Sequence, residues 1–201
     1  MSEKQRKTRS LSEIDSPEDS MIIGSKVILR DKRLDDALND YTWRTDPELA
    51  RLDAAPMPTT TFPKYLSDYA SELRCSSSTR HRFAIDTLDG KHIGNCGYYD
   101  IDETKGEAEL GIMIGNRDYW DKGYGTDAVT TLVSHIFRQT NLKRIYLKTL
   151  DSNSRAQKCF KKCGFTPYRH LVRDRYNFVL MELHRDQWRK NSKQKLNQVR
   201  A

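Results

Sequence analysis

Apolar and polar residues alternate in several short segments of the chain, and this period of two predicts β-strands. The predicted strands are 21–31, 80–87, 92–102, 107–115, 144–151 and 177–183. In the fourth, one face is apolar: Ala108, Leu110, Ile112 and Ile114. The other face carries Glu107, Glu109, Gly111 and Met113. Asp89-Gly90 predicts a tight hairpin between the second and third strands.

Four segments instead repeat apolar residues at helical spacing: 33–52, 63–74, 125–141 and 152–165. In the third, positions 129, 132, 133, 136 and 137 form one apolar stripe. The first is interrupted near Asp46-Pro47. Four of its residues are expected to point inward: Leu34, Leu38, Tyr41 and Leu49.

This order of elements is neither all-β nor a regular β-α repeat, so it predicts an α/β fold. We expect a mixed, mostly antiparallel sheet flanked by about four helices. The 201 residues fit one domain. Residues 1–20 are rich in Ser, Glu, Lys and Arg and are expected to be disordered. The domain is predicted at 21–188, followed by a basic tail at 189–201.

The net charge of +7 is concentrated near the C-terminus, where residues 184–201 hold six Lys or Arg and one Asp. Such a segment either binds RNA, a ribosome or an acidic protein, or is simply a solvated helix or frayed end. The longest apolar runs fall short of the ~20 residues that a membrane span needs. MSEKQRKTRS also lacks the apolar stretch of a secretory signal, so we expect a cytoplasmic protein.

The four cysteines form no C-x-x-C pair and the histidines are scattered, so no metal site is expected. Cys159 and Cys163 are four residues apart on a predicted helix and could share a face. We interpret them as small buried hydrophobes.

The stretch WDKGYGTDAV, residues 120–129, places Gly123 and Gly125 where the third predicted helix begins. Unpaired N–H groups at a helix N-terminus bind phosphate readily, and Lys122 adds a positive charge. The full dinucleotide-binding and P-loop patterns are both absent. On its own, the stretch fits a phosphate site and a plain turn equally well.

Two segments in order, ELGIMIGNRDYWDKGYGTDAV and LDSNSRAQKCFKKCGF, resemble the GNAT superfamily of acetyl-CoA-dependent N-acetyltransferases. The resemblance covers residues 21–188. VILRDKRLDDALNDYTWRTDPEL and FVLMELHRDQW are similar, more narrowly, to the branch of ribosomal-protein alanine N-acetyltransferases. The resemblance implies two parallel central strands that splay apart, with the cofactor arm of acetyl-CoA in the gap.

The resemblance also assigns cofactor contacts. The backbone amides that it places on the CoA pyrophosphate belong to Lys122, Gly123, Tyr124, Gly125 and Thr126. Ile112, Met113 and Ile114 would line the pantetheine arm. Asn153 corresponds to an asparagine that contacts the arm near the thioester; the ordinary alternative is a helix N-cap, and one residue can serve both roles.

Acetyl transfer needs a neutral amine, and amines are mostly protonated at pH 7. Glu109, on the strand beside the cofactor, is the first candidate for the base; the alternative is a surface carboxylate. Glu107 shares its face but lies nearer the solvent end. Many family members have a tyrosine that protonates the leaving thiolate where this chain has Phe160. The acid therefore stays unassigned, with Tyr168 and Ser154 as candidates or a thiolate that leaves unaided.

Acceptor recognition is expected from residues 34–74 and nearby strands, with Trp43, Arg44, Met57 and Tyr98 as candidate wall residues. The branch resemblance favours a protein N-terminus as acceptor. A polyamine or aminoglycoside is the alternative, which a deep acidic pocket would favour. A non-catalytic CoA- or RNA-binding module is the rival from another class. A homodimer is also compatible with the sequence.

Overall fold

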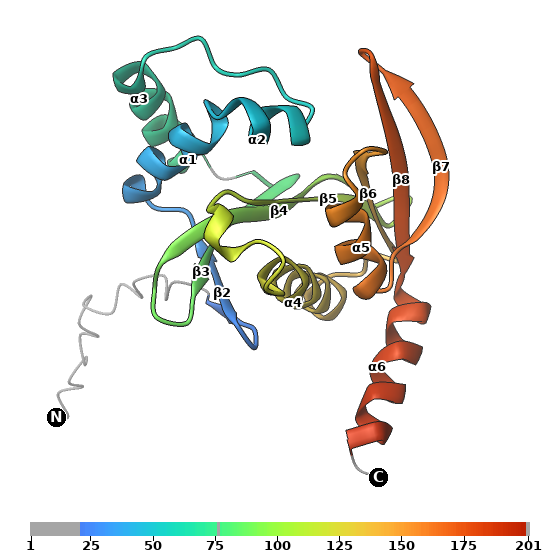
Figure 1. The fold of residues 1–201 in the computed structure, drawn as a ribbon. Coiled ribbons are helices and arrows are strands. Elements are labelled where there is room, and N and C mark those ends of the chain that lie inside the picture. The colour runs from blue at the N-terminus through green and yellow to red at the C-terminus, as the bar shows by residue number, and fades with distance from the viewer. Residues whose placement is uncertain (1–20, 76, 200–201) are drawn as a thin grey trace, which may run out of the picture.

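A single eight-stranded sheet organises the domain (Figure 1). The computed structural model describes residues 21–75 and 77–199, the last five by their backbone alone. The strand order is β1-β2-β3-β4-β5-β6-β8-β7. The bounds are β1 Ile22–Ile23, β2 Val27–Asp31, β3 Arg80–Thr87, β4 His92–Asp102, β5 Glu107–Ile114, β6 Arg144–Leu150, β7 Thr166–Arg173 and β8 Tyr176–His184. The predicted disorder of 1–20 lies outside the described residues.

Six α-helices flank the sheet in the described chain, against about four predicted. They are α1 Ala37–Arg44, α2 Pro47–Leu52, α3 Phe62–Leu73, α4 Tyr124–Gln139, α5 Ser154–Lys162 and α6 Arg185–Val199. Two 3-10 helices, Leu34–Asp36 and Arg117–Tyr119, precede α1 and α4. In Figure 1, α1–α3 form one group and α4 and α5 another, with β4 and β5 between them.

The expected splayed pair of parallel strands is confirmed. β5 and β6 are the parallel neighbours, and their register covers only Glu107–Glu109 against Arg144–Tyr146. Beyond Glu109, β5 continues to Ile114 paired with β4 alone. One side of Leu110–Ile114 is therefore open to a ligand or to side chains.

The core lies between the sheet and α4, and the predicted stripe of α4 is confirmed. Val129, Leu132, Val133, Ile136 and Phe137 are all buried. They pack with apolar side chains of the sheet in one continuous cluster. This burial fixes α4, and hence its first turn, against the open end of β5.

The inward face predicted for the first helix is wrong at two of its four residues. Leu49 is buried as predicted, and Tyr41 is half-buried. Leu34 and Leu38 are 48% and 59% exposed, whereas Asp36 and Asp40 are buried. The reason is electrostatic: the Arg30 guanidinium binds Asp36 at 2.8 Å, and the Lys32 ammonium binds Asp40 at 2.7 Å. Apolar periodicity does not detect a helix that buries paired charges.

Two further segments differ from the prediction. A turn closed by the Gly24 N–H and the Val27 carbonyl (2.8 Å) divides the first strand into β1 and β2. β7 was not predicted as a separate strand, because its side chains are nearly all exposed and follow no apolar alternation. The basic segment from residue 189 continues α6 as far as Val199, in agreement with the alternative of a solvated helix.

Candidate functional site

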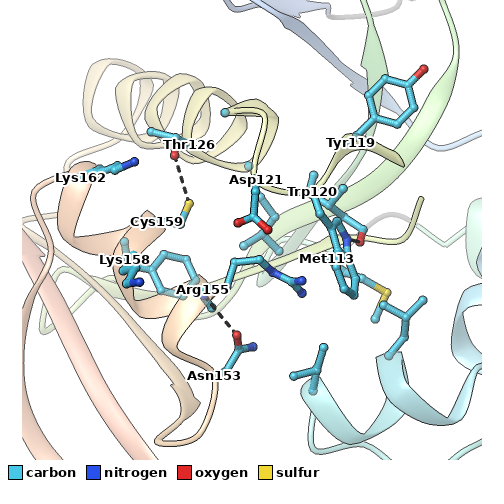
Figure 2. A pocket seen from close by; sticks show the side chains of 18 of the residues that line it. Met113, Tyr119, Trp120, Asp121, Thr126, Asn153, Arg155, Lys158, Cys159 and Lys162 are labelled. Atoms are coloured by element: carbon cyan, nitrogen blue, oxygen red, sulfur yellow. Dashed lines mark hydrogen bonds between the residues drawn. The ribbon is translucent and has the colours of Figure 1, made fainter. Parts of the chain in front are cut away.

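A cavity of about 240 Å³, here called the turn cavity, lies beside the open part of β5. Its walls come from β5, from the turn before α4, and from α5 (Figure 2). Seven residues indicated by the sequence line it: Ile112, Met113, Ile114, Gly123, Gly125, Thr126 and Asn153. Lys122 and Tyr124 are not among its lining residues; the Tyr124 ring packs edge-on against Tyr119 at 4.9 Å.

The turn presents a row of unpaired backbone donors. The first backbone hydrogen bond of α4 is donated by the Asp127 N–H to the Gly123 carbonyl, at 3.0 Å. Within the described residues, the N–H groups of Tyr124, Gly125 and Thr126 have no hydrogen-bond acceptor. This geometry matches an anion site at a helix N-terminus.

The two glycines serve different purposes. Gly123 has φ +87°, a left-handed conformation that side chains other than glycine rarely adopt. A Cβ on Gly125 would lie 3.6 Å from Ile114 Cγ1 and 3.7 Å from Cys159 Sγ, which are ordinary contacts. Packing of the chain alone therefore does not require glycine at 125, whereas a closely approaching ligand would.

Three cations of α5 also line the turn cavity: Arg155, Lys158 and Lys162. The Arg155 guanidinium lies 3.3 Å from the centroid of the Trp120 ring, which holds it over the cavity (Figure 2). These residues were missed from the sequence. Their spacing of three and four residues along α5 is a signal that would have found them.

Asn153 caps α5 and faces the same cavity. Its Oδ1 accepts a hydrogen bond from the Ala156 N–H at 3.1 Å (Figure 2). The N-cap interpretation is therefore correct. Within the described chain its side-chain amide nitrogen makes no hydrogen bond, so a donor remains for a ligand.

Glu109 is 3% exposed, so the alternative of a surface carboxylate is wrong. The Tyr99 hydroxyl donates to its Oε1 at 3.0 Å, and the Lys148 ammonium lies 3.1 Å from its Oε2. All three residues line a second cavity of about 310 Å³, the gap cavity, between β5, β6 and the β7–β8 hairpin. Glu107 instead accepts from Arg144 at 2.6 Å and lines none of the cavities described here.

A third cavity of about 570 Å³, the helical cleft, separates α1 and α3 from β3–β5. Asp40 on its floor is fully engaged: Lys32 lies at 2.7 Å, the Tyr69 hydroxyl donates at 3.0 Å, and the Asn95 amide donates at 2.6 Å. This network joins α1, α3, β4 and the end of β2. The floor is thus a fixed, internally neutralised surface.

Of the four expected acceptor-wall residues, only Arg44 lines the helical cleft. Trp43 is buried, and a Cβ on Gly115 would lie 2.0 Å from its ring, so Trp43 fills the space that this glycine leaves. Tyr98 is buried and stacked on His81 at 4.6 Å. Met57 is exposed and lines none of the three cavities, whereas the next residue, Pro58, lines the helical cleft.

Most charges around the helical cleft are paired. Asp68 binds Lys64 at 2.6 Å, and Glu72 binds Arg82 at 2.7 Å. Arg44, Arg80 and Asp53 also line the cleft, and in the part of the chain that the structure describes they have no ion pair or hydrogen bond from their side chains. With four carboxylates and four cations, the lining carries no net charge.

Comparison with known families identifies the fold and its chemistry. The family model described as "Acetyltransferase (GNAT) domain" matches residues 26–166. The chain belongs to the GNAT acetyltransferase family. This match contains the turn, the open part of β5 and α5.

Individual GNAT relatives agree. An uncharacterized N-acetyltransferase p20 of Bacillus licheniformis is 28% identical over 142 residues, which are 70% of this chain and 79% of that protein. Spermidine N-acetyltransferase of Vibrio cholerae, solved with CoA and spermine, superposes with a TM-score of 0.73 at 19% identity, covering 82% of this chain and 98% of that one. Aminoglycoside acetyltransferase AAC(6')-Ib with coenzyme A gives 0.68 at 22% identity, with the same coverages.

The protein is therefore an acetyl-CoA-dependent acetyltransferase, with acetyl-CoA as its cosubstrate. The interpretation as a non-catalytic module is set aside. No described helix is long and apolar enough to cross a membrane. Over residues 21–75 and 77–199, no group of three or more His, Cys, Asp or Glu is placed to hold a metal ion.

The two candidate proton donors for the leaving thiolate do not line the cavities described here. Tyr168 on β7 and Ser154 line none of the three cavities, and Phe160 lines the turn and gap cavities without a proton to give. Tyr99 is the hydroxyl that reaches both the helical cleft and the gap cavity. Burial, followed by the negative charge of Glu109, raises the pKa of Tyr99, so it holds its proton firmly.

Cys159 is a half-buried thiol in the wall of the turn cavity, not a simple core residue. The Thr126 hydroxyl donates to its sulfur at 3.5 Å (Figure 2). A hydrogen bond with Cys163, together with Thr126 and the charge of Lys162, lowers the pKa of Cys159 to about 7 against the opposing effect of burial. Of the four cysteines, Cys96 is the buried one.

Proposed function

We propose that this protein acetylates the α-amino group of a protein N-terminus. The observation that carries the proposal is the charge of the helical cleft. Its carboxylates other than Asp53 are already paired within the chain, and Arg44 and Arg80 are free. An acceptor with one ammonium group followed by carbonyl oxygens suits such a cleft better than a polycation does.

We propose that acetyl-CoA occupies the turn cavity. The N–H groups from Lys122 to Thr126 hold its pyrophosphate, and the cations of α5 add to the attraction. The pantetheine arm follows Ile112–Ile114 along the edge that β6 leaves open. Asn153 contacts the arm near the thioester through its free amide nitrogen. The unpaired donors and the room above Gly125 support this placement.

Glu109 is proposed as the base, acting through Tyr99. The Tyr99 hydroxyl already donates to Glu109, so its oxygen can accept a proton from the acceptor as its own proton moves to the carboxylate. If so, Glu109→Gln and Tyr99→Phe each shift the pH–rate profile in the same direction. A profile unchanged in both variants removes this path.

A small polyamine or aminoglycoside is the second candidate acceptor. It is favoured by the solved relatives, of which one was solved with spermine and another with kanamycin, although their likeness to this chain is one of fold. Thiol release from acetyl-CoA can be measured with an Ala-initiated peptide, spermidine and kanamycin. We expect the highest kcat/KM with the peptide. A tenfold preference for spermidine or kanamycin would overturn the proposal.

The basic helix α6 is the segment through which we expect any contact with RNA or the ribosome. Arg189, Lys190 and Lys193 are exposed along it. Binding that depends on phosphate contacts weakens steeply with salt. Filter binding of ribosomal RNA at rising salt, compared with a triple Lys/Arg-to-Gln variant at these positions, tests the expectation.

A further inference from the structure

Asp53 occupies the place where the three cavities meet. Only Asp53 and Ile112 line the turn cavity, the helical cleft and the gap cavity alike. Ile112 belongs to the open part of β5 and offers no polar side-chain atom. Asp53 is thus the polar side chain common to the cavity proposed for the cofactor and the cleft proposed for the acceptor.

Among the described residues, the Asp53 carboxylate makes no ion pair and accepts no side-chain or backbone hydrogen bond, unlike Asp40, Asp68 and Glu72 beside the same cleft. Its side chain is exposed to solvent and lines all three cavities, whose walls displace part of its water. This loss of hydration raises the pKa of Asp53, and the charge of Arg44 opposes the rise.

Charged and titratable groups face this carboxylate from every side of the junction. Arg44 comes from α1 and Tyr99 from β4, and the charge of Asp53 reaches both. Glu109 from β5, Lys148 from β6, and Arg173 and Asp174 from the end of the β7–β8 hairpin line the gap cavity with it. The charged residues that share the turn cavity with it are Asp121, Arg155, Lys158 and Lys162. Since Lys148 is bound to Glu109, it is not free to neutralise Asp53.

The backbone around Asp53 is held in a fixed turn. Asp46 caps the start of α2 by accepting from the N–H groups of Glu48 and Leu49. At the other end, Ala54 has φ +49° and the Ala55 N–H returns to the Ala50 carbonyl at 3.0 Å. A left-handed alanine is retained where glycine is usual, and it fixes the direction in which Asp53 leaves the helix.

We propose that Asp53 binds the ammonium group of the acceptor beside the thioester and takes its first proton. The inference rests on the proposed function, and it adds a group that the sequence did not indicate. R–NH3+ gives one proton to the carboxylate, and the freed lone pair attacks the thioester carbonyl. The C–N bond forms, the C–S bond breaks, and CoA leaves as its thiolate. The second N–H proton passes through Tyr99 to Glu109.

The first test compares Asp53→Asn with Glu48→Gln. Both variants remove one carboxylate from α2 or its end, but Glu48 is exposed, binds Arg117 at 2.9 Å and lines none of the three cavities. The acceptor is whichever of the Ala-initiated peptide, spermidine and kanamycin gives the highest kcat/KM with the unmodified protein. We expect its kcat/KM to fall at least ~100-fold in Asp53→Asn, because general-base catalysis contributes on that scale. Glu48→Gln should stay near the unmodified protein, and both should keep its KM for acetyl-CoA. Equal activity of the two variants would overturn the proposal.

A second test separates a chemical role from a structural one. With trifluoroethylamine, an acceptor that is mostly neutral at pH 7, the defect of Asp53→Asn should shrink at least tenfold relative to the basic acceptor. An equal defect with both amines would contradict proton transfer to Asp53.

A third measurement needs no turnover. The Asp53 carboxyl can be titrated by 13C NMR in the CoA-bound protein, which has no acetyl group to transfer, with Asp53→Asn identifying its signal. Adding each of the three acceptors in turn should lower the titration midpoint, because a nearby ammonium favours the carboxylate. If no acceptor moves the midpoint, Asp53 is not the ammonium site. Absence of turnover in the unmodified protein would instead refute the proposed function and leave this readout intact.

Discussion

The turn cavity and the helical cleft meet at Ile112 and Met113 of β5 and at Asp53, but the rest of their walls comes from different parts of the chain. The turn cavity consists of backbone donors in one turn and of side chains from β5 and α5, within residues 112–162 apart from the end of α2. The helical cleft consists of side chains that α1, α3, β3 and β4 bring together over residues 32–113. A ligand group common to all substrates can be held by the first; discrimination between acceptors depends on the second.

The largest effect is expected where the cleft floor is broken. Asp40→Asn removes the nearer carboxylate from the buried Lys32 ammonium and leaves it only Asp36, at 3.9 Å. We expect unfolding free energy to fall by about 3 kcal/mol, measured by urea denaturation. Asp68→Asn, whose ion pair is exposed, should change it by less than about 0.5 kcal/mol. Equal losses in the two variants would mean that the floor is not held by its buried charges.

The turn cavity is tested by Gly125→Asp, with Gly125→Asn as the control of equal shape. An aspartate in the first turn of α4 is favourable to the helix, so the folded state should not lose stability. Opposite a phosphate, the same charge should weaken acetyl-CoA binding by about 100-fold, as expected for like charges a few ångströms apart.

For Gly125→Asp, calorimetry should therefore show weaker binding of acetyl-CoA, whereas thermal unfolding of the free protein should show no loss of stability. If the aspartate and asparagine variants bind acetyl-CoA equally, charge at the turn has no role and the pyrophosphate lies elsewhere. The contrast with Asp40→Asn is the sharpest form of the comparison. One change damages stability, and the other damages binding alone.

The difference between the two sides also explains what the sequence could predict. Gly123 acts through its own backbone, and Asn153 acts on the backbone of a residue three positions away. Their local roles can therefore be predicted from the adjacent residues in the sequence. The stripe on α4 and the strands at 80–87 and 92–102 are local in the same sense. Each is fixed by periodicity or by turn chemistry.

The acceptor side was poorly predicted because its determinants are pairings across the sequence. Arg30 meets Asp86 and Lys32 meets Asp40 only after β2, β3 and α1 have packed. Asp53 is one aspartate among many until the fold places it where three cavities join. Apolar periodicity reports neither ion pairing nor the position of a loop relative to a cavity.

A smaller effect is expected at Cys159, on the wall of the turn cavity. Since its pKa is lowered to about 7, half of the thiol is ionised there, and alkylation by iodoacetamide should rise through pH 7. Bound acetyl-CoA should slow the reaction by about tenfold by covering the sulfur. Mass spectrometry of the modified peptide, with Cys159→Ser as the blank, gives both numbers.

Thr126→Val sharpens this prediction. The substitution removes the hydroxyl that donates to the Cys159 sulfur, so the midpoint of alkylation should move to higher pH. Buried Cys96 should stay unmodified in the folded protein, because burial raises its pKa and shields it. Alkylation of Cys159 that ignores acetyl-CoA would contradict the placement of the cosubstrate.

The smallest effect is expected at Ala54, the left-handed residue after Asp53. Glycine at position 54 relieves about 1 kcal/mol of backbone strain in the folded state, but it lowers the unfolding free energy by a comparable amount because the unfolded chain gains freedom. The unfolding free energy of Ala54→Gly, measured by urea denaturation, should therefore be nearly unchanged. Ala55→Gly, at a neighbour without positive φ, has no strain to relieve and should cost about 0.5–1 kcal/mol. If Ala54 serves only to end α2, both variants keep full activity. If it holds Asp53 at the junction, Ala54→Gly lowers kcat/KM for the acceptor while acetyl-CoA binding stays unchanged, and the helical cleft alone is affected.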